Sequence, residues 1–405
     1  MPWKNTDQMN ERVKFIATFL GRAKSFSELC DEFEISRKTG YKWVDRYESE
    51  GVKALDDRSR RPLNSPHAVS SEITELLLDA RRKHPRWGPR KLLVIVKRKV
   101  PKLILPSAST VGLILKRNDF IKRRGRRRAS SPYGKKLEGY DYSNAIWGAD
   151  FKGHFPVGGK RCYPLTMTDG FSRYLIRCKL LPRPLHAPVQ KEFESAFREY
   201  GMPDAIRTDN GAPFSTLAPG GLSRLSVWWI KLGIRPERIQ PGRPDQNGRH
   251  ERMHATLKAE TARPPKTNFR AQQKSFDDFQ TEYNDVRPHE ALDFEVPSSV
   301  YNSSTRQFPN RLPEIEYPVH FRVEKSYPNG VISLGQTQWY ISGCLRSEFI
   351  GLEEIDNDIW KVYYGPIALG YLDGQTEYKS KNRHFGTMIR IDGEVTTSNR
   401  RPYSR

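Results

Sequence analysis

The sequence predicts a multidomain protein with all-α helix-turn-helix domains first, an α/β core next and a small β-barrel or sandwich near the C-terminal end. Three observations predict this order. Apolar residues recur at helical spacing before residue 120. Strand-like runs mix with helical patterns over residues 144–302. Six short strand-like runs, separated by turn dipeptides such as Asn329-Gly330, fill residues 313–376.

Charge and cysteine content narrow the class of protein. The 405 residues leave room for two to four domains, and the net charge of +22 favours a polyanionic partner, DNA or RNA. The four cysteines contain no C-x-x-C pair, which argues against a zinc ribbon or a disulfide framework. No signal-peptide pattern and no run of 18 apolar residues occurs, so we expect a cytoplasmic protein without membrane contact.

Residues 1–62 are expected to form a helix-turn-helix domain. Helical periodicity covers residues 7–24, and Ser25 with Glu28 has capping-box spacing before a helix over Phe26–Phe33. Ser36 is a candidate N-cap for a third, basic helix that Gly51 ends. The alternative is a three-helix bundle with a solvated basic face. The residues expected to face a DNA groove are Arg37, Lys38, Thr39, Lys42 and Arg46.

The pattern of residues 63–120 predicts a second helix-turn-helix domain, with helices over Ser70–His84, Arg90–Lys99 and Thr110–Asn118. The alternative is a purely structural helical bundle. Residues 121–143 form a basic linker that cannot pack inside a core. It is either a disordered tether or an arm that contacts DNA phosphates. The arginines expected to make those contacts are Arg123, Arg124, Arg126, Arg127 and Arg128.

Three acidic residues of the core, 144–302, stand where rigid elements are predicted. Asp150 lies within a strand-like run, and Asp209 follows the short strand Ala205–Thr208. Glu251 lies in the first turn of a helix that begins after a Gly- and Pro-rich loop. Brought together by folding, the three carboxylates would form an all-oxygen site for two Mg²⁺ or Mn²⁺ ions.

Other interpretations of these residues remain open. Asp209 fits a simple turn, and Glu251 fits a favourable charge at a helix N-terminus. His250 to His254 also fits H-E-x-x-H, a zinc-protease pattern in which Glu282 could be a third ligand. That pattern explains neither the other carboxylates nor the basic charge. We expect Arg249 and His250 on the helix surface next to DNA, and His254 on the same helix face as Glu251.

The segments WGADFKGHF, RTDNGAPF, PGRPDQNGRHERMHATLK and YNDVRPHEAL together resemble the core of bacterial insertion-sequence transposases with a retroviral-integrase-like DDE domain. The resemblance implies an RNase H-like core with a catalytic triad of Asp150, Asp209 and Glu251. It also implies terminal inverted repeats and target DNA as substrates, and a homo-oligomer on DNA. The interval between Asp209 and Glu251 is longer than usual for the family, and we assign the extra residues to the loop-like stretch Ser215–Arg224.

The rest of the core is expected to contain strands and helices in mixed order, and Asp169 is expected to be a turn residue. By the same resemblance, residues 313–376 are expected to be a DNA-binding or assembly barrel. The polar, basic composition of residues 377–405 predicts a disordered tail. Two alternatives to a transposase are a catalytically silent DNA-binding regulator derived from one, and a nuclease that cuts without joining strands.

The expected core elements are Cys162–Asp169, Tyr174–Leu180, Pro188–Tyr200, Leu222–Leu232, Ile234–Ile239 and Phe269–Asn284.

Overall fold

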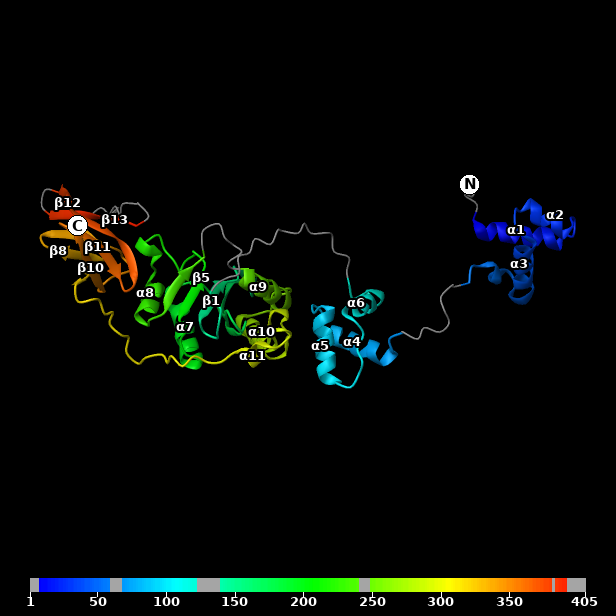
Figure 1. Cartoon of the computed structure of the whole chain (residues 1–405), viewed down its shortest axis with the longest axis horizontal. Coiled ribbons are helices and arrows are strands. Elements are labelled where there is room, and N and C mark those ends of the chain that lie inside the picture. Colours follow the sequence, from blue (N-terminus) through cyan, green and yellow to red (C-terminus); the bar gives the residue numbers. More distant parts are fainter. Residues whose placement is uncertain (1–6, 59–67, 122–138, 240–247, 381–382, 392–405) are drawn as a thin grey trace. The chain divides into compact units, whose positions relative to one another are not determined.

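The computed structural model describes residues 7–58, 68–121, 139–239, 248–380 and 383–391 (Figure 1). The chain divides into two compact units, Met1–Ser71 and Glu72–Arg405. None of the helices in the described ranges is long and apolar enough to cross a membrane. Arg123 to Arg128 and the loop that precedes Glu251 lie outside the described residues.

The first unit has the helix order that the sequence predicts. Helices α1 (Gln8–Leu20), α2 (Phe26–Glu32) and α3 (Arg37–Glu50) are followed by the short η1 (Val52–Leu55). The capping box forms at Ser25 and Glu28, Ser36 caps α3, and α3 ends at Gly51, which has a φ of 72°. A turn of four residues joins α2 to α3, as in a helix-turn-helix.

One side-chain prediction in this unit is wrong. Helical spacing predicts that Tyr41 packs inward, but it is 55% exposed and stacks on Phe26 with ring centroids 4.1 Å apart. Gly40, Trp43 and Val44 form the buried face of α3 instead. Gly40 allows this close packing, because a Cβ there would lie 2.8 Å from Cys30 Sγ.

The second unit begins at the first turn of α4 (Ser71–Lys83), which is followed by α5 (Pro89–Lys99) and α6 (Ala108–Arg117). Ser107 caps α6, so this helix begins two residues earlier than expected. Eight residues connect α5 to α6, a longer connection than the tight turn of a helix-turn-helix. These helices contact the core directly, since His84 Nδ1 lies 3.2 Å from Glu282 Oε1.

The core is built on a mixed sheet in which β4, β3, β1, β5 and β6 follow one another, while β2 pairs with the start of β3. The neighbours β1–β3 and β3–β4 are antiparallel, and β1–β5 and β5–β6 are parallel. The α/β class is therefore confirmed. The strands are β1 (Ile146–Phe151), β2 (Phe155–Val157), β3 (Lys160–Asp169), β4 (Leu175–Leu181), β5 (Ala205–Thr208) and β6 (Arg235–Arg238).

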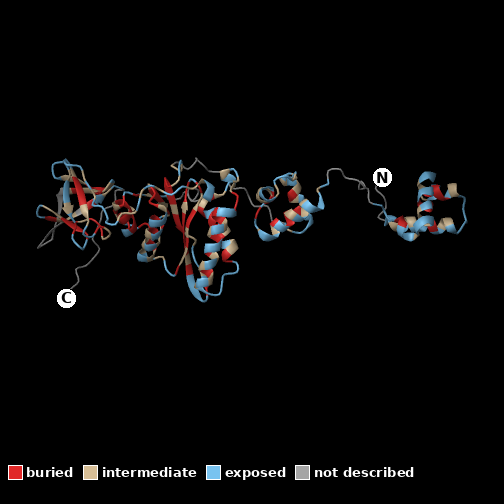
Figure 2. Ribbon diagram, turned by 90° about the horizontal axis from the view of Figure 1, so that it is seen from below, coloured by how far each residue is buried: buried red, intermediate tan, exposed pale blue. Residues whose placement is uncertain are grey.

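Helices cover both faces of this sheet, and Figure 2 shows buried residues along the strands and on the facing sides of the helices. On one face, Trp147 and Met167 pack against Phe193 of α7 and Trp229 of α8. On the other face, side chains of β3 and β4 pack against α9 and α10. The core helices are α7 (His186–Tyr200), α8 (Arg224–Lys231), α9 (Gly248–Thr261), α10 (Phe269–Thr281) and α11 (Pro297–Val300), with a π-helical turn at Glu282–Val286.

Asp169 is a turn residue, as expected, and it is almost fully buried. Its carboxylate accepts hydrogen bonds from the Asn144 backbone (2.8 Å) and from the Ser172 backbone and hydroxyl (2.8 and 2.6 Å). Burial raises the pKa of Asp169 against these hydrogen bonds. The carboxylate therefore holds the β3–β4 turn and the approach to β1 together.

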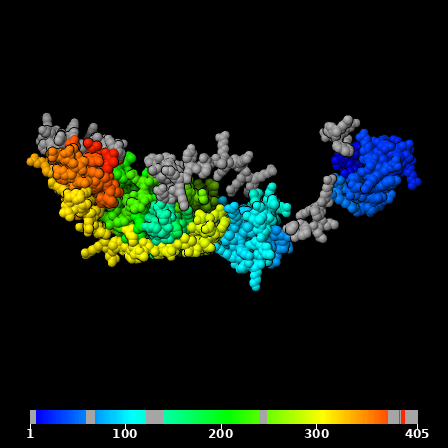
Figure 3. All heavy atoms as spheres, viewed as in Figure 1, coloured from blue at the N-terminus to red at the C-terminus, as the bar shows by residue number. Residues whose placement is uncertain are grey.

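After α11 the chain lies along the surface of the core (Figure 3). Tyr301 stacks on Tyr174 with ring centroids 4.4 Å apart, and Phe308 packs on Phe197 at 6.2 Å. Arg306 donates hydrogen bonds to the carbonyl oxygens of Pro203 (2.6 Å) and Leu232 (3.0 Å). This segment leads from the core to the C-terminal sheet.

The C-terminal sheet has seven strands in the order β7-β10-β11-β12-β13-β9-β8. A closed barrel is not confirmed, because no hydrogen-bonded ladder joins the end strands β7 and β8 in the described part of the chain. Leu222, Val227 and Ile230 of the core share this sheet's apolar cluster. The strands are β7 (Arg322–Lys325), β8 (Val331–Leu334), β9 (Thr337–Tyr340), β10 (Phe349–Asp356), β11 (Ile359–Tyr364), β12 (Ile367–Ser380) and β13 (Arg383–Arg390).

The expectation that residues 377–405 are a disordered tail is wrong for its first part. β12 continues to Ser380, and β13 pairs with β12 on one side and with β9 on the other. Met388 is fully buried in the apolar cluster of the sheet. The charged residues of this stretch mask the strand pattern in the sequence. The strand needs only a few apolar contacts, because its backbone forms hydrogen bonds with strands on both sides.

Candidate carboxylate site

Asp150 and Asp209 lie at the carboxyl ends of two neighbouring parallel strands. In the β1–β5 ladder, Ile146 pairs with Ala205 and Ala149 with Thr208. Asp150 and Asp209 come one position after the second of these pairs, so each directly follows the end of the ladder. The interval between the two aspartates in the sequence therefore equals the register of the two strands.

Glu251 lies on α9 and lines a pocket together with Asp150. Glu251 is exposed in the first turn of the helix, whereas Asp150 is 9% exposed. The pocket has a volume of about 580 Å³. Asp209 is not among its lining residues, which are Asp150, Phe151, Lys152, Gly153, Glu251, His254, Ala255, Lys258, Ala259 and Arg263.

One face of α9 forms a wall of this pocket. Its members Glu251, His254, Ala255, Lys258 and Ala259 follow the i, i+3, i+4, i+7, i+8 spacing of a single helix face. Helical spacing predicts that Ala255 faces inward, but it is exposed. Lys258 was not among the residues expected at the site, although its position two helical turns after Glu251 was a signal that could have found it.

The Thr166 hydroxyl is the centre of a buried hydrogen-bond network behind Asp150. It donates to the Asp150 carbonyl oxygen (3.1 Å) and contacts Nε2 of His254 (2.7 Å) and of His250 (3.2 Å). A hydroxyl has one proton, so both histidines must donate from Nε2. The expectation that His250 is a surface residue is wrong, because it is 5% exposed.

Burial keeps both imidazoles neutral. Desolvation lowers the pKa of His250 to about 4 and the pKa of His254 to about 2. His254 Nδ1 lies 3.8 Å from Asp150 Oδ2, but a neutral ring makes no ion pair with that carboxylate. The histidines therefore act as uncharged supports of the strand that bears Asp150.

The zinc-protease interpretation does not fit this geometry. The Nε2 atoms of His250 and His254 both bond to Thr166, so neither is free to bind a metal ion through that atom. Glu282, the candidate third ligand, contacts His84 instead. Within the described residues, no group of three or more His, Cys, Asp or Glu side chains is arranged to hold a metal ion.

The donor chemistry of the pocket suits a hard divalent cation. Asp150 and Glu251 contribute carboxylate oxygens to a space that opens to solvent, and Asp209 follows the adjacent strand. Asp209 also accepts a hydrogen bond from the Gly211 backbone (3.0 Å), which ties its carboxylate to the turn that follows β5. Lys152, Lys258 and Arg263 add positive charge around the same pocket.

The residues expected to contact DNA fall into three groups. Arg37, Lys38 and Lys42 are exposed on α3, while Thr39 and Arg46 are partly buried. The arginines of the basic linker lie outside the described residues. Arg249 donates to the Gly170 carbonyl oxygen (2.9 Å), and its guanidinium lies 4.3 Å from the centre of the Tyr140 ring. Its contacts in this structure are thus within the core.

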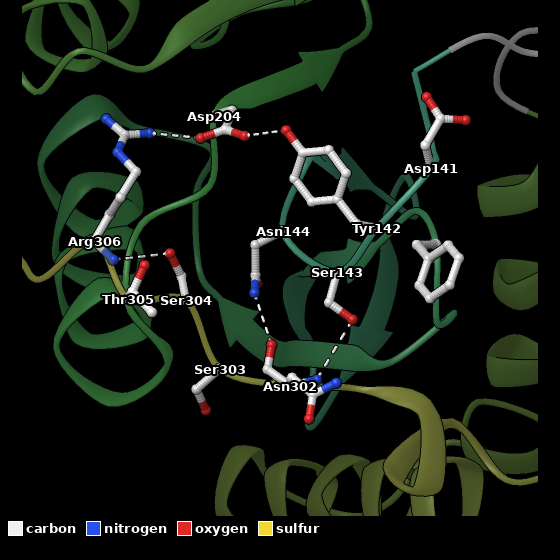
Figure 4. A pocket seen from close by; sticks show the side chains of 11 residues that line it. Asp141, Tyr142, Ser143, Asn144, Asp204, Asn302, Ser303, Ser304, Thr305 and Arg306 are labelled. Carbon is white, nitrogen blue, oxygen red and sulfur yellow. Dashed lines mark hydrogen bonds and ion pairs between the residues drawn. The ribbon is translucent and has the colours of Figure 1, made fainter.

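A second pocket, of about 430 Å³, lies at the opposite ends of β1 and β5 (Figure 4). Asp204 accepts a hydrogen bond from the Tyr142 hydroxyl (2.6 Å) and pairs with Arg306 (3.2 Å). Asn144 donates to the Asn302 carbonyl oxygen (2.7 Å). These contacts fasten the segments before β1 and after α11 to the core, so we assign this pocket a structural role.

Comparisons with known protein families match the N-terminal helices and the core. The integrase core domain family matches residues 141–244, and a second integrase core domain family matches residues 232–297. A helix-turn-helix domain family matches residues 11–62, and a homeodomain-like domain family matches residues 39–115. The integrase matches include all six core strands and α9, and hence the carboxylate pocket.

Two relatives from insertion elements match more than half of the chain, and a third matches a smaller part. The uncharacterized 39.2 kDa protein of insertion element IS476 from Xanthomonas euvesicatoria is 26% identical over 62% of this chain and 70% of that protein. The uncharacterized 31.7 kDa protein of insertion element IS407 from Burkholderia multivorans is 25% identical over 59% of this chain and 82% of that protein. The transposase for insertion sequence element IS904 from Lactococcus lactis is 26% identical over 40% of this chain and 63% of that protein.

The mixed sheet with helices on both faces is an integrase-like RNase H fold. Helix-turn-helix matches precede this core, as the sequence predicts. Together, these similarities support an insertion-sequence transposase with an integrase-like core.

Proposed function

We propose that this protein is a DNA transposase that binds the terminal inverted repeats of its element, cleaves DNA there and joins the freed 3′ ends to target DNA. The observation that carries the proposal is the placement of Asp150 and Glu251 in one pocket of an integrase core, with Asp209 after the neighbouring strand. This is a polynucleotidyl transfer, in which a water and then a 3′-hydroxyl attacks phosphorus.

Asp150, Asp209 and Glu251 are the residues that would hold two Mg²⁺ or Mn²⁺ ions. When bound, the ions activate the attacking oxygen and stabilise the charge on the leaving oxygen. Thr166 and the two buried histidines keep β1 and the Asp150 backbone in place. Lys152 and Lys258 lie where they can neutralise a phosphate next to the scissile bond.

The other parts of the chain have matching roles in the proposal. The exposed basic face of α3 reads the element ends, and the basic linker contacts phosphates. Joining two ends in one reaction requires both to be held together, so we propose a homo-oligomer assembled on DNA in the bacterial nucleoid.

The test is strand transfer in vitro with the terminal repeats that flank the gene, in Mg²⁺ and in EDTA. Asp150→Asn and Glu251→Gln are each expected to reduce cleavage and joining by orders of magnitude, because each removes one charged ligand. Asp278→Asn is the matched control, since Asp278 is exposed on α10 and pairs with Lys274 outside the pocket. Wild-type-like strand transfer by Asp150→Asn would show that the assignment is wrong.

A second candidate function is a DNA-binding regulator without strand chemistry. It is favoured by the lack of a three-ligand metal group among the described residues. Specific binding to the terminal repeats, with no cleavage in Mg²⁺ or Mn²⁺, would establish this function. Cleavage without joining would instead identify a nuclease.

A further inference from the structure

A third hollow, a groove of about 1000 Å³, lies between the start of β3, the end of β4 and the connection from α9 to α10. It is larger than the carboxylate pocket and shares no lining residue with it. We call it the β3–β4 groove. Its lining residues are Val157, Gly158, Lys160, Arg161, Tyr163, Pro182, Arg183, Pro184, Leu185, Thr267, Asn268 and Phe269.

The groove lies at the same end of the core sheet as Asp150. In the antiparallel β1–β3 ladder, Asp150 pairs with Thr166 and Phe151 with Leu165. Residues of β3 that precede Leu165 therefore extend past the carboxyl end of β1. Tyr163 pairs with Leu181, so the end of β4 and residues 182–185 lie at this end as well.

The connection between α9 and α10 links the two hollows. Arg263, just after α9, lines the carboxylate pocket, and Thr267, which follows it in the same connection, lines the groove. The β2–β3 turn packs against this connection at Gly158, where a Cβ would lie 2.7 Å from the Thr267 carbonyl oxygen. Gly158 has a φ of +54°, so both the backbone and the space favour glycine there.

The residues that line the groove carry a net positive charge. Its lining includes Lys160, Arg161 and Arg183 and no acidic residue, and all three cations are exposed. None of them forms an ion pair with another residue in the described ranges, whereas Arg198 and Lys274 on core helices pair with acids. Cations that stay unpaired along a groove attract a polyanion.

Two further features suit a nucleic acid backbone. The 13-residue helix α10 begins at Phe269, so its N-terminal N–H groups add partial positive charge at the groove. Lys266 and Arg270, both exposed, flank the same residues. The partly exposed ring of Tyr163 offers an apolar surface for a sugar or a base.

We propose that the β3–β4 groove binds the phosphodiester backbone of the DNA that passes through the carboxylate pocket. The proposal rests on the proposed function, because DNA is the polyanion that an integrase core would hold at this sheet end. Lys160, Arg161 and Arg183 contact successive phosphates beyond the reacting bond, and the connection after Arg263 bridges the two hollows.

The test compares the triple variant Lys160→Gln, Arg161→Gln, Arg183→Gln with wild type in DNA-binding titrations without divalent ions, so that no strand chemistry is needed. Each phosphate contact adds about 0.9 to the slope of log affinity against log salt. For three contacts, a fourfold rise in salt from about 50 to about 200 mM weakens wild-type binding about 40-fold more than it weakens the variant. The matched control is Lys14→Gln, Arg82→Gln, Lys274→Gln, which removes three cations that already pair with acids.

Two labelled duplexes distinguish which DNA occupies the groove. A reduced slope only for the terminal-repeat duplex assigns the groove to the element end, and a reduced slope only for a random-sequence duplex assigns it to target DNA. Either result, or both, supports the proposal if the control variant keeps the wild-type slope. Unchanged slopes for both duplexes, or an equal change in the control, would overturn it and leave an acidic protein segment as the occupant.

The same titrations separate this inference from the proposed function. Wild-type protein that shows the expected slopes but never cleaves DNA in Mg²⁺ would refute the transposase chemistry and leave the groove assignment intact. Normal cleavage and joining by the wild-type protein, together with a salt slope in the triple variant equal to that of wild type, would support the transposase chemistry and refute the groove assignment.

Discussion

Replacing Thr166 with valine tests the support of the carboxylate site most directly. The change keeps the β-branched shape of a fully buried strand residue and removes only the hydroxyl. It leaves the His250 and His254 Nε2–H groups and the Asp150 carbonyl oxygen without their shared partner. Each buried polar group that loses its partner costs about 1–3 kcal/mol, so the three groups together should lower the free energy of unfolding by at least about 3 kcal/mol.

The assay is thermal unfolding of the full chain followed by circular dichroism, in which the second unit should melt about 6 °C lower. Thr168→Val is the matched control on the same strand, because the Thr168 hydroxyl lies 3.5 Å from His250 Nδ1 and makes a much weaker contact. Its melting temperature should stay within about 2 °C of wild type. A Thr166→Val protein that melts with the wild type would refute the network.

Two further predictions concern stability. Since burial lowers the pKa of His250 to about 4 and of His254 to about 2, the unfolded chain binds more protons than the folded one below pH ~6.5. Stability is therefore full above that pH and falls by up to about 1.4 kcal/mol per pH unit per histidine as the pH drops toward 4. Urea unfolding at neutral and acidic pH measures this loss, and an identical pH dependence in His250→Asn would contradict it. Gly40→Ala should destabilise the first unit by about 1–3 kcal/mol, because its Cβ would lie 2.8 Å from Cys30 Sγ. Gly21→Ala, with 3.5 Å to the nearest atom, is the control, and equal melting of the two variants would count against tight packing at Gly40.

Local sequence signals located most of the elements. Caps at Ser25, Ser36 and Ser107 set helix starts, since a side-chain oxygen there satisfies an N–H group that the helix leaves free. Strand β5 has the predicted bounds, because Ala205–Thr208 is closed by an Asn-Gly turn. Two predictions failed: that Tyr41 packs inward and that residues 383–390 are disordered. Contacts with other helices and strands decide burial and strand pairing at both places.

The chain's local patterns placed Asp150 on a strand and Asp209 directly after one, and the interval between them equals the register of β1 and β5. Helical spacing, which is a local property of the sequence, also indicates that Glu251, His254 and Lys258 share one helix face. Folding in three dimensions was needed to turn His250 and His254 inward onto Thr166 and to bring Lys160, Arg161 and Arg183 into one groove. Those contacts join residues from different strands and helices, and the packing of the whole sheet sets which of them meet.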